Sequence, residues 1–167
     1  MLVCAMNPCP CGWYTDPKRE CHCTPVQIQR YLSKISGPLL DRLDIHLEVP
    51  ALPAADVLSV NLGENSAAIK ERVLRARLLQ QDRLPISAAV TNAQMNHRQI
   101  KKFCGLNEEC KRLLKMAIEE LNLSARAYDK ILKVARTIAD LADAGSIQTE
   151  HLAEAIQYRS LDRDWWG

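Results

Sequence analysis

Aromatic side chains are scarce in this chain, at 5% of its 167 residues, and long apolar runs are absent. No stretch of about 18 consecutive apolar residues occurs, so the sequence predicts no membrane-spanning helix. The N-terminus also lacks the basic region and long apolar block of a secretion signal. Neither sign of charge dominates, because the formal net charge is +2, and this balance decides nothing about a nucleic-acid partner.

Apolar residues make up 47% of the chain, enough for a hydrophobic core built from aliphatic side chains. The length suits one domain of ordinary size or a domain with an appendage. Residues 1–60 are rich in proline and cysteine, whereas helical periodicity begins near Asn65. We therefore expect a mainly α protein with a less regular N-terminal third.

Two short segments of the N-terminal third have the pattern of strands. Residues 1–6 form an apolar run. From Leu43 to Val49 apolar and polar residues alternate, which predicts a half-buried strand closed by Pro50. Residues 51–64 then have the composition of a linker.

Polar residues at helix starts predict a bundle of antiparallel helices after this linker. Asn65 or Ser66 begins a helix that runs to about Arg83, and Ser124 begins a long helix that ends near Gly145. Shorter helices are expected over residues 26–35 and after Asn96 or His97, Asn107 and Thr149.

The helix predicted over residues 66–83 combines apolar and basic positions. Ile69, Val73 and Ala76 lie three or four residues apart, which predicts one buried face. The same stretch holds five basic residues: Lys70, Arg72, Arg75, Arg77 and Arg83. These cations suit nucleic-acid phosphates, although such a face is more often simply solvated.

Four of the seven cysteines form two C-x-C pairs in a turn-rich segment: Cys9, Cys11, Cys21 and Cys23. Four thiolates on two short loops can surround one tetrahedral zinc ion, so the pattern predicts a zinc site. The alternatives are reduced thiols in a mobile loop, or His22 as a substitute ligand. An odd number of cysteines fits reduced thiols in the cytoplasm better than a disulfide framework. The other three, Cys4, Cys104 and Cys110, are expected to be small core residues.

Arg42 lies between Asp41 and Asp44 at the start of the second predicted strand. A cation at a rigid strand edge suits a phosphate on a neighbouring molecule. The simpler alternative is a surface ion pair with one of the two aspartates.

Four long segments resemble, in the same order, those of the magnesium-chelatase-like AAA+ ATPases, in particular the ComM/YifB family. They are AMNPCPCG (5–12), GPLLDRLDIHLEVP (37–50), SARAYDKILKVARTIADL (124–141) and HLAEAIQYR (151–159). The resemblance implies a lid-type helical bundle preceded by the last strands of an AAA+ α/β core with a cysteine-rich insertion. It divides the chain into that core remnant (1–50), a linker (51–64), the lid (65–160) and a tail (161–167).

The resemblance also implies roles for three residues. Asn7 matches the sensor 1 residue that orients the attacking water, Arg42 matches an arginine finger for the neighbouring subunit's ATP, and Arg126 matches sensor 2. Judged from the residues alone, Asn7 also suits a turn, and Arg126 also suits a solvent-facing position. Arg126 follows the cap Ser124 at the positive end of a helix, where a nearby anion is favoured. Arg136 is the other sensor 2 candidate.

The sequence contains no G-x-x-x-x-G-K-[ST] motif and no apolar strand that ends in paired carboxylates. We therefore expect that this chain alone does not hydrolyse ATP in the ordinary way. The resemblance implies a parent protein that uses ATP and Mg²⁺, forms a hexameric ring and drives DNA branch migration during recombination in natural transformation. The rival interpretations are a zinc-stabilised nucleic-acid-binding module and a chelatase-type regulatory ATPase.

Overall fold

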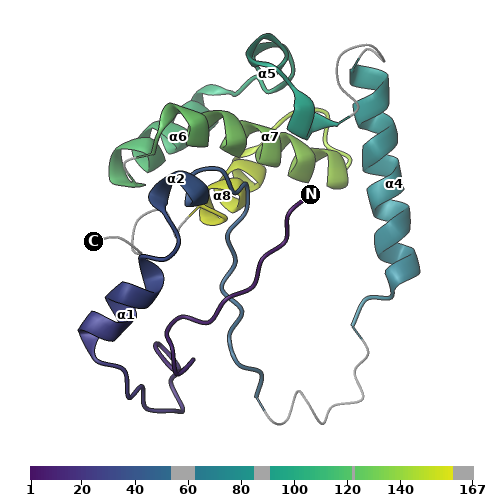
Figure 1. Ribbon diagram of the computed structural model, residues 1–167. Coiled ribbons are helices and arrows are strands. Elements are labelled where there is room, and N and C mark those ends of the chain that lie inside the picture. The colour runs from purple at the N-terminus through teal and green to yellow at the C-terminus, as the bar shows by residue number, and fades with distance from the viewer. Residues whose placement is uncertain (54–62, 85–90, 122, 160–167) are drawn as a thin grey trace.

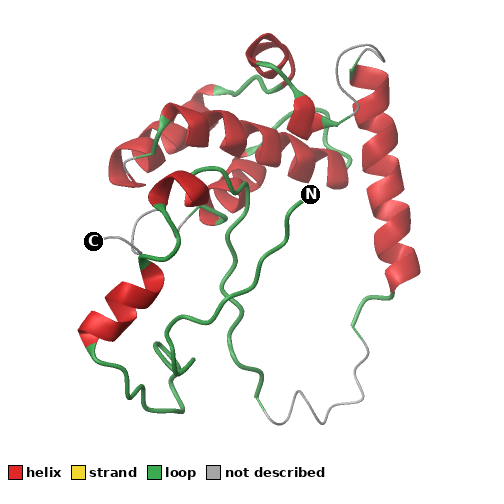
Figure 2. Ribbon diagram, viewed as in Figure 1, coloured by secondary structure: helices red, strands yellow, loops and turns green. Residues whose placement is uncertain are grey.

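The computed structural model describes residues 1–53, 63–84, 91–121 and 123–159. Within these ranges the secondary structure is helical and contains no strand, and Figure 2 shows helices joined by loops. The predicted mainly α class is thus confirmed. No helix in this part of the chain is long and apolar enough to cross a membrane. Most of the predicted linker (54–62) and the tail (161–167) lie outside the described residues.

The helices fall into a short N-terminal pair and a C-terminal bundle. The pair is α1 (Pro25–Leu32) and α2 (Gly37–Leu40). The bundle contains α4 (Ser66–Arg83), the 3-10 helix η1 (Asn92–Gln94), α5 (His97–Phe103), α6 (Glu108–Leu121), α7 (Ala125–Leu141) and α8 (Thr149–Gln157). Helix α7 is central, because it contacts α4, η1, α5 and α8, while α6 packs on α8. Figure 1 shows α4 standing at one side of the bundle.

Polar caps begin most of the bundle helices, as the sequence predicted. The side chains of Asn65, Asn96 and Ser124 each accept a hydrogen bond from the backbone N–H three residues further on. Asn107 caps α6 in the same way by accepting from the N–H of Cys110. Each such cap stabilises its helix by about 1 kcal/mol. At α8 the prediction is one residue off, because Gln148 is the cap.

The hydrophobic core is aliphatic, as the composition indicated. Its buried members are Leu84, Met95, Ile100, Cys104, Cys110, Leu114, Ile131, Leu132, Ala135, Ala139, Ile147, Leu152 and Ala155. Among the described residues, Phe103 is the one aromatic side chain packed against this cluster. Cys104 and Cys110 are buried as predicted, but Cys4 is exposed and is not a core residue.

The two predicted strands are not formed. Residues 1–6 and 43–49 are loops with exposed apolar side chains, and Val3 and Val49 are 80% and 89% exposed. A strand depends on a hydrogen-bonded neighbour, and the described part of the chain offers no strand to pair with. The second segment is instead tethered to the end of α8, where the His46 N–H donates to the Tyr158 carbonyl at 2.9 Å.

Helix α4 buries less of its surface than its pattern predicted. Its buried residues are Ala76 and Gln80, whereas Ile69 and Val73 are exposed. The hydrogen bonds that hold α4 on the bundle are made by the side chains of Gln80 and Arg83, which lie near the C-terminal end of the helix. The N-terminal half of α4 therefore extends past the bundle (Figure 1).

Candidate functional site

Two of the predicted nucleotide-contacting residues, Arg42 and Arg126, belong to segments that meet at the start of α7. The Asp41 carboxylate accepts a hydrogen bond from Ser124 Oγ at 3.0 Å and lies 3.7 Å from the Arg126 guanidinium. Arg126 is 73% exposed, so most of its side chain faces solvent. A carboxylate thus lies near the positive end of α7, where a nearby anion is favoured.

Arg42 does not form the surface ion pair that was its simpler interpretation. Asp41 pairs with Arg126, and Asp44 pairs with Lys130 at 3.0 Å. The exposed Arg42 side chain donates to the Pro38 carbonyl at 2.7 Å, a bond within the turn formed by α2. Its charge therefore has no carboxylate partner among the described residues.

The backbone behind Arg42 is held by two cations of the bundle. Lys130 donates to the carbonyls of Arg42 and Leu43, and the buried Arg159 also donates to the Leu43 carbonyl. The contacts of these two cations were not predicted, because contacts between distant residues leave no local pattern in the sequence.

Asn7 lies elsewhere, at the base of the cysteine-rich loop. A methyl group added at Gly12 would lie 3.7 Å from Asn7 Nδ2. Gly12 has a φ of +84°, a backbone conformation that favours glycine and tightens the loop around Cys11. No hydrogen bond joins Asn7 to Arg42 or Arg126 in the part of the chain that the structure describes.

The four cysteines of the C-x-C pairs converge on one point. Their Sγ atoms all lie within 4.8 Å of one another, with Cys9 Sγ 3.3 Å from that of Cys11 and 3.8 Å from that of Cys21. Four thiols at this spacing match the ligand set of a tetrahedral zinc ion. His22 is exposed and is not part of the cluster.

The thiols of the cluster differ in acidity. The backbone N–H of Trp13 lowers the pKa of Cys11 to about 6. Burial raises the pKa of Cys23 to about 12. Because a thiolate is the metal-binding form, Cys11 offers a ready ligand at neutral pH, whereas Cys23 ionises when a cation is present to compensate.

Arg136 is excluded as the alternative sensor 2 residue. It is buried, its Nε donates to Asp140 Oδ1 at 3.1 Å, and its Nη2 donates to the Ala144 carbonyl at 2.6 Å. A guanidinium with these partners organises the end of α7 and is not open to a nucleotide.

The basic helix α4 also offers fewer cations than its sequence suggested. Arg72 pairs with Glu64 at 2.7 Å, and Arg83 turns inward to Asp140. Lys70, Arg75 and Arg77 remain exposed for a phosphate partner. This reduction weakens the interpretation of α4 as a nucleic-acid-binding helix.

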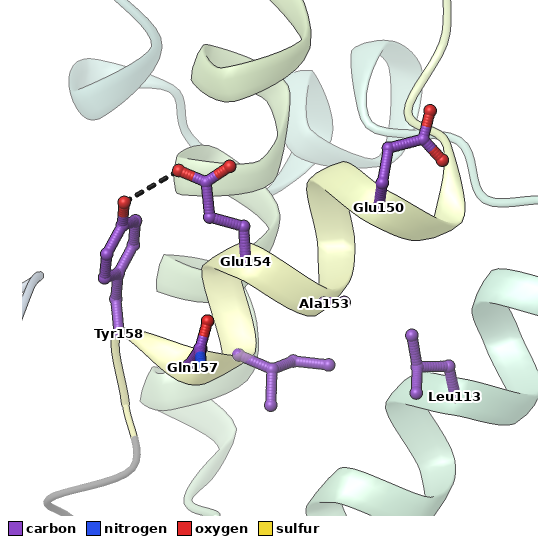
Figure 3. Close-up of a pocket in the computed structure, with 7 residues that line it drawn as sticks. Leu113, Glu150, Ala153, Glu154, Gln157 and Tyr158 are labelled. Atoms are coloured by element: carbon purple, nitrogen blue, oxygen red, sulfur yellow. Dashed lines mark hydrogen bonds between the residues drawn. The ribbon is translucent and has the colours of Figure 1, made fainter.

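A shallow pocket lies between α6 and α8 (Figure 3), away from the start of α7. Its lining includes Leu113, Glu150, Ala153, Glu154, Gln157 and Tyr158. Glu154 accepts a hydrogen bond from the Tyr158 hydroxyl at 2.7 Å. Two carboxylates and an apolar floor do not suit a triphosphate, so we do not assign nucleotide binding to this pocket.

Comparison with known proteins accounts for both parts of the chain. The profile described as "Magnesium chelatase, subunit ChlI C-terminal" matches residues 63–159, more than half of the chain. The chain belongs to this family. A second profile, "Magnesium chelatase, subunit ChlI", matches residues 1–57. The two matches are separated by residues 58–62, inside the predicted linker.

Several curated relatives of this family align with nearly the whole chain. Competence protein ComM of Haemophilus influenzae is 45% identical over 163 residues, or 97% of this chain. An uncharacterized protein YifB of Escherichia coli is 44% identical over 167 residues, and the uncharacterized protein Rv2897c of Mycobacterium tuberculosis is 34% identical over 158. The chain spans 31% of the length of each, in their C-terminal part.

Proposed function

We propose that this chain is the C-terminal part of an AAA+ ATPase, in which Arg42 acts as an arginine finger and Arg126 as sensor 2. The observation that carries the proposal is the Asp41 carboxylate held between Ser124 and Arg126. A carboxylate of this chain already accepts from Ser124 Oγ and pairs with the Arg126 guanidinium, so the start of α7 suits an anionic group such as a γ-phosphate.

The proposed chemistry divides between this chain and the rest of the protein. Bound ATP and Mg²⁺ would supply the phosphoryl group and its counter-charge, and the triphosphate cradle would belong to the part of the relatives' length that this chain does not span. Arg42 would neutralise the charge that develops on a neighbouring subunit's γ-phosphate, a contribution typically worth about 10³–10⁵ in rate. Its exposed side chain and single bond to a backbone carbonyl leave it available for that role.

Asn7 is proposed as sensor 1, where its amide would orient the attacking water. Its place beside Gly12 links it to the cysteine-rich loop. We propose residues 1–50 as the end of the ATPase core, 51–64 as linker, 65–160 as lid and 161–167 as tail. The family matches to residues 1–57 and 63–159 support a boundary near the linker.

We further propose that the parent protein is a cytoplasmic hexameric ring that drives DNA branch migration during transformation. The name of the H. influenzae relative, a competence protein, supports a role in competence. For the cysteine cluster we propose one bound zinc ion that stabilises the loop without taking part in hydrolysis.

The finger assignment is tested with Arg42→Ala in the full-length gene product. ATP turnover is expected to fall by about 10³-fold or more while ATP binding is retained. Arg98→Ala, which removes an exposed arginine of α5, is the matched control and should turn over normally. Normal turnover by Arg42→Ala would end the assignment.

A further inference from the structure

We propose that Lys130 is a positioning residue that couples the helical bundle to the arginine finger. The inference rests on the function proposed for Arg42, because it concerns how that side chain is aimed. Lys130 does not reach a nucleotide; it acts through the backbone that carries Arg42.

The ammonium group of Lys130 is fully engaged by one short segment. It donates to the carbonyls of Arg42 and Leu43, the latter at 3.0 Å, and lies 3.0 Å from Asp44 Oδ1. A lysine has three N–H donors, and here three consecutive residues supply three acceptors. The Lys130 side chain is only 18% exposed, so these bonds are partly shielded from competing water.

Neighbouring contacts hold the same segment, while the Arg42 side chain stays exposed. Arg159 donates to the Leu43 carbonyl, and the His46 N–H donates to the Tyr158 carbonyl at 2.9 Å. Asp41 is bound to Ser124 on the other side of Arg42. Every one of these partners lies in α7, in α8 or directly beside them, so the bundle holds the backbone that carries Arg42.

Lys130 lies on α7 close to Arg126, the proposed sensor 2 residue. Lys130 follows Arg126 by four residues, so both side chains project from the same face of the helix. Lys130 thus fixes the finger segment to the same helix face that presents Arg126, so the two proposed nucleotide contacts are held in one frame.

The test uses Lys130→Met in the full-length gene product, with Lys133→Met as matched control. Lys133 lies on the same helix and also donates to a carbonyl, that of Ala93 at 2.9 Å, but does not touch the finger segment. We expect Lys130→Met to lower kcat for ATP hydrolysis by about 10–100-fold, with KM within about twofold, because misplacing a catalytic group impairs the chemical step. Lys133→Met should keep both values.

Two milder variants distinguish a loss of positioning from a folding defect in Lys130→Met. Lys130→Arg keeps the charge and donors and should recover part of the lost kcat. Asp44→Asn changes an exposed carboxylate that is one of the three acceptors and should lower kcat less than Lys130→Met. Equal losses in Lys130→Met and Lys133→Met, or a rise in KM without a fall in kcat, would overturn the proposal.

Amide hydrogen exchange on the 167-residue chain gives a readout that needs no activity. The His46 amide should exchange faster in Lys130→Met than in the wild type and be unchanged in Lys133→Met. If Arg42→Ala hydrolyses ATP normally, the finger assignment fails, whatever the exchange result. If Arg42→Ala is inactive while Lys130→Met has normal kcat and exchange, only the positioning role fails.

Discussion

Arg83, the last residue of α4, donates two hydrogen bonds to the carboxylate of Asp140 in α7, 57 positions further along the chain. Arg136 and Asn92 donate to the same carboxylate. The Asp140 side chain is completely buried, so two guanidinium groups and an amide replace the water it has lost. This shared carboxylate fixes α4 and η1 on α7.

Replacing Asp140 by asparagine should destabilise the fold. The substitution removes the negative charge between Arg83 and Arg136 and leaves a buried guanidinium without its counter-ion, a loss of about 3–5 kcal/mol in unfolding free energy. Urea unfolding followed by circular dichroism measures this loss. The exposed Asp82→Asn on α4 is the control and should stay within about 0.5 kcal/mol of wild type. Equal stability of the two variants would contradict the account.

The cysteine cluster should bind about one zinc ion per chain when the protein is purified without chelator. Elemental analysis measures the content. Cys9→Ser removes the buried member of the cluster and should abolish stoichiometric zinc, whereas the exposed Cys4→Ser lies outside it and should not. A metal-free wild-type protein, or zinc retained in Cys9→Ser, would refute the zinc site.

The buried Cys104 should make the fold less stable in alkaline solution. Burial raises the pKa of Cys104 to about 11, so the thiol ionises in the unfolded chain before it ionises in the folded one. The protonated thiol therefore contributes fully to the unfolding free energy below the unfolded pKa, near 9. As the pH rises above that value the unfolding free energy falls, by about 1 kcal/mol at pH 10.

Urea unfolding at pH 8 and pH 10 checks this dependence. Cys104→Ala removes the titrating group, so its stability should fall less between the two pH values than that of the wild type. Identical pH dependence in the two proteins would show that Cys104 does not couple ionisation to folding.

Arg126→Ala should weaken nucleotide binding more than it slows chemistry. The exposed guanidinium is proposed to hold a phosphate in the ground state as well as in the transition state, so its loss raises KM for ATP with a smaller effect on kcat. Steady-state kinetics of the full-length protein separate the two effects, with Arg98→Ala as control. An unchanged KM would remove Arg126 from the nucleotide site.

The helical part of the fold was predictable because its signals are local. Asn65, Asn96, Asn107 and Ser124 were expected to begin helices, and each caps the predicted helix. The cysteine cluster was also predictable, since two C-x-C pairs separated by a short turn-rich loop can meet without help from the rest of the chain.

Features that depend on distant partners were missed. The alternation from Leu43 to Val49 predicted a strand, but a strand forms only beside another strand. Helix α2 was not predicted, although its Pro38 lies in the first turn, a position that suits proline. Arg83 was predicted among the basic residues that suit a phosphate, and Arg136 was a sensor 2 candidate. Only the packing of α4 on α7 reveals their common carboxylate.

The core cluster has a consequence for dissecting the chain. Every buried member lies between Leu84 and Ala155, and the polar network around Asp140 falls within Gln80 to Gly145. A fragment beginning at Gly63 would therefore retain the whole core cluster, while it would lose the exposed apolar side chains of residues 1–53. Such a fragment suits spectroscopy of the helical bundle, and the difference between its unfolding free energy and that of the longer chain would measure how much the segment with Arg42 stabilises the bundle.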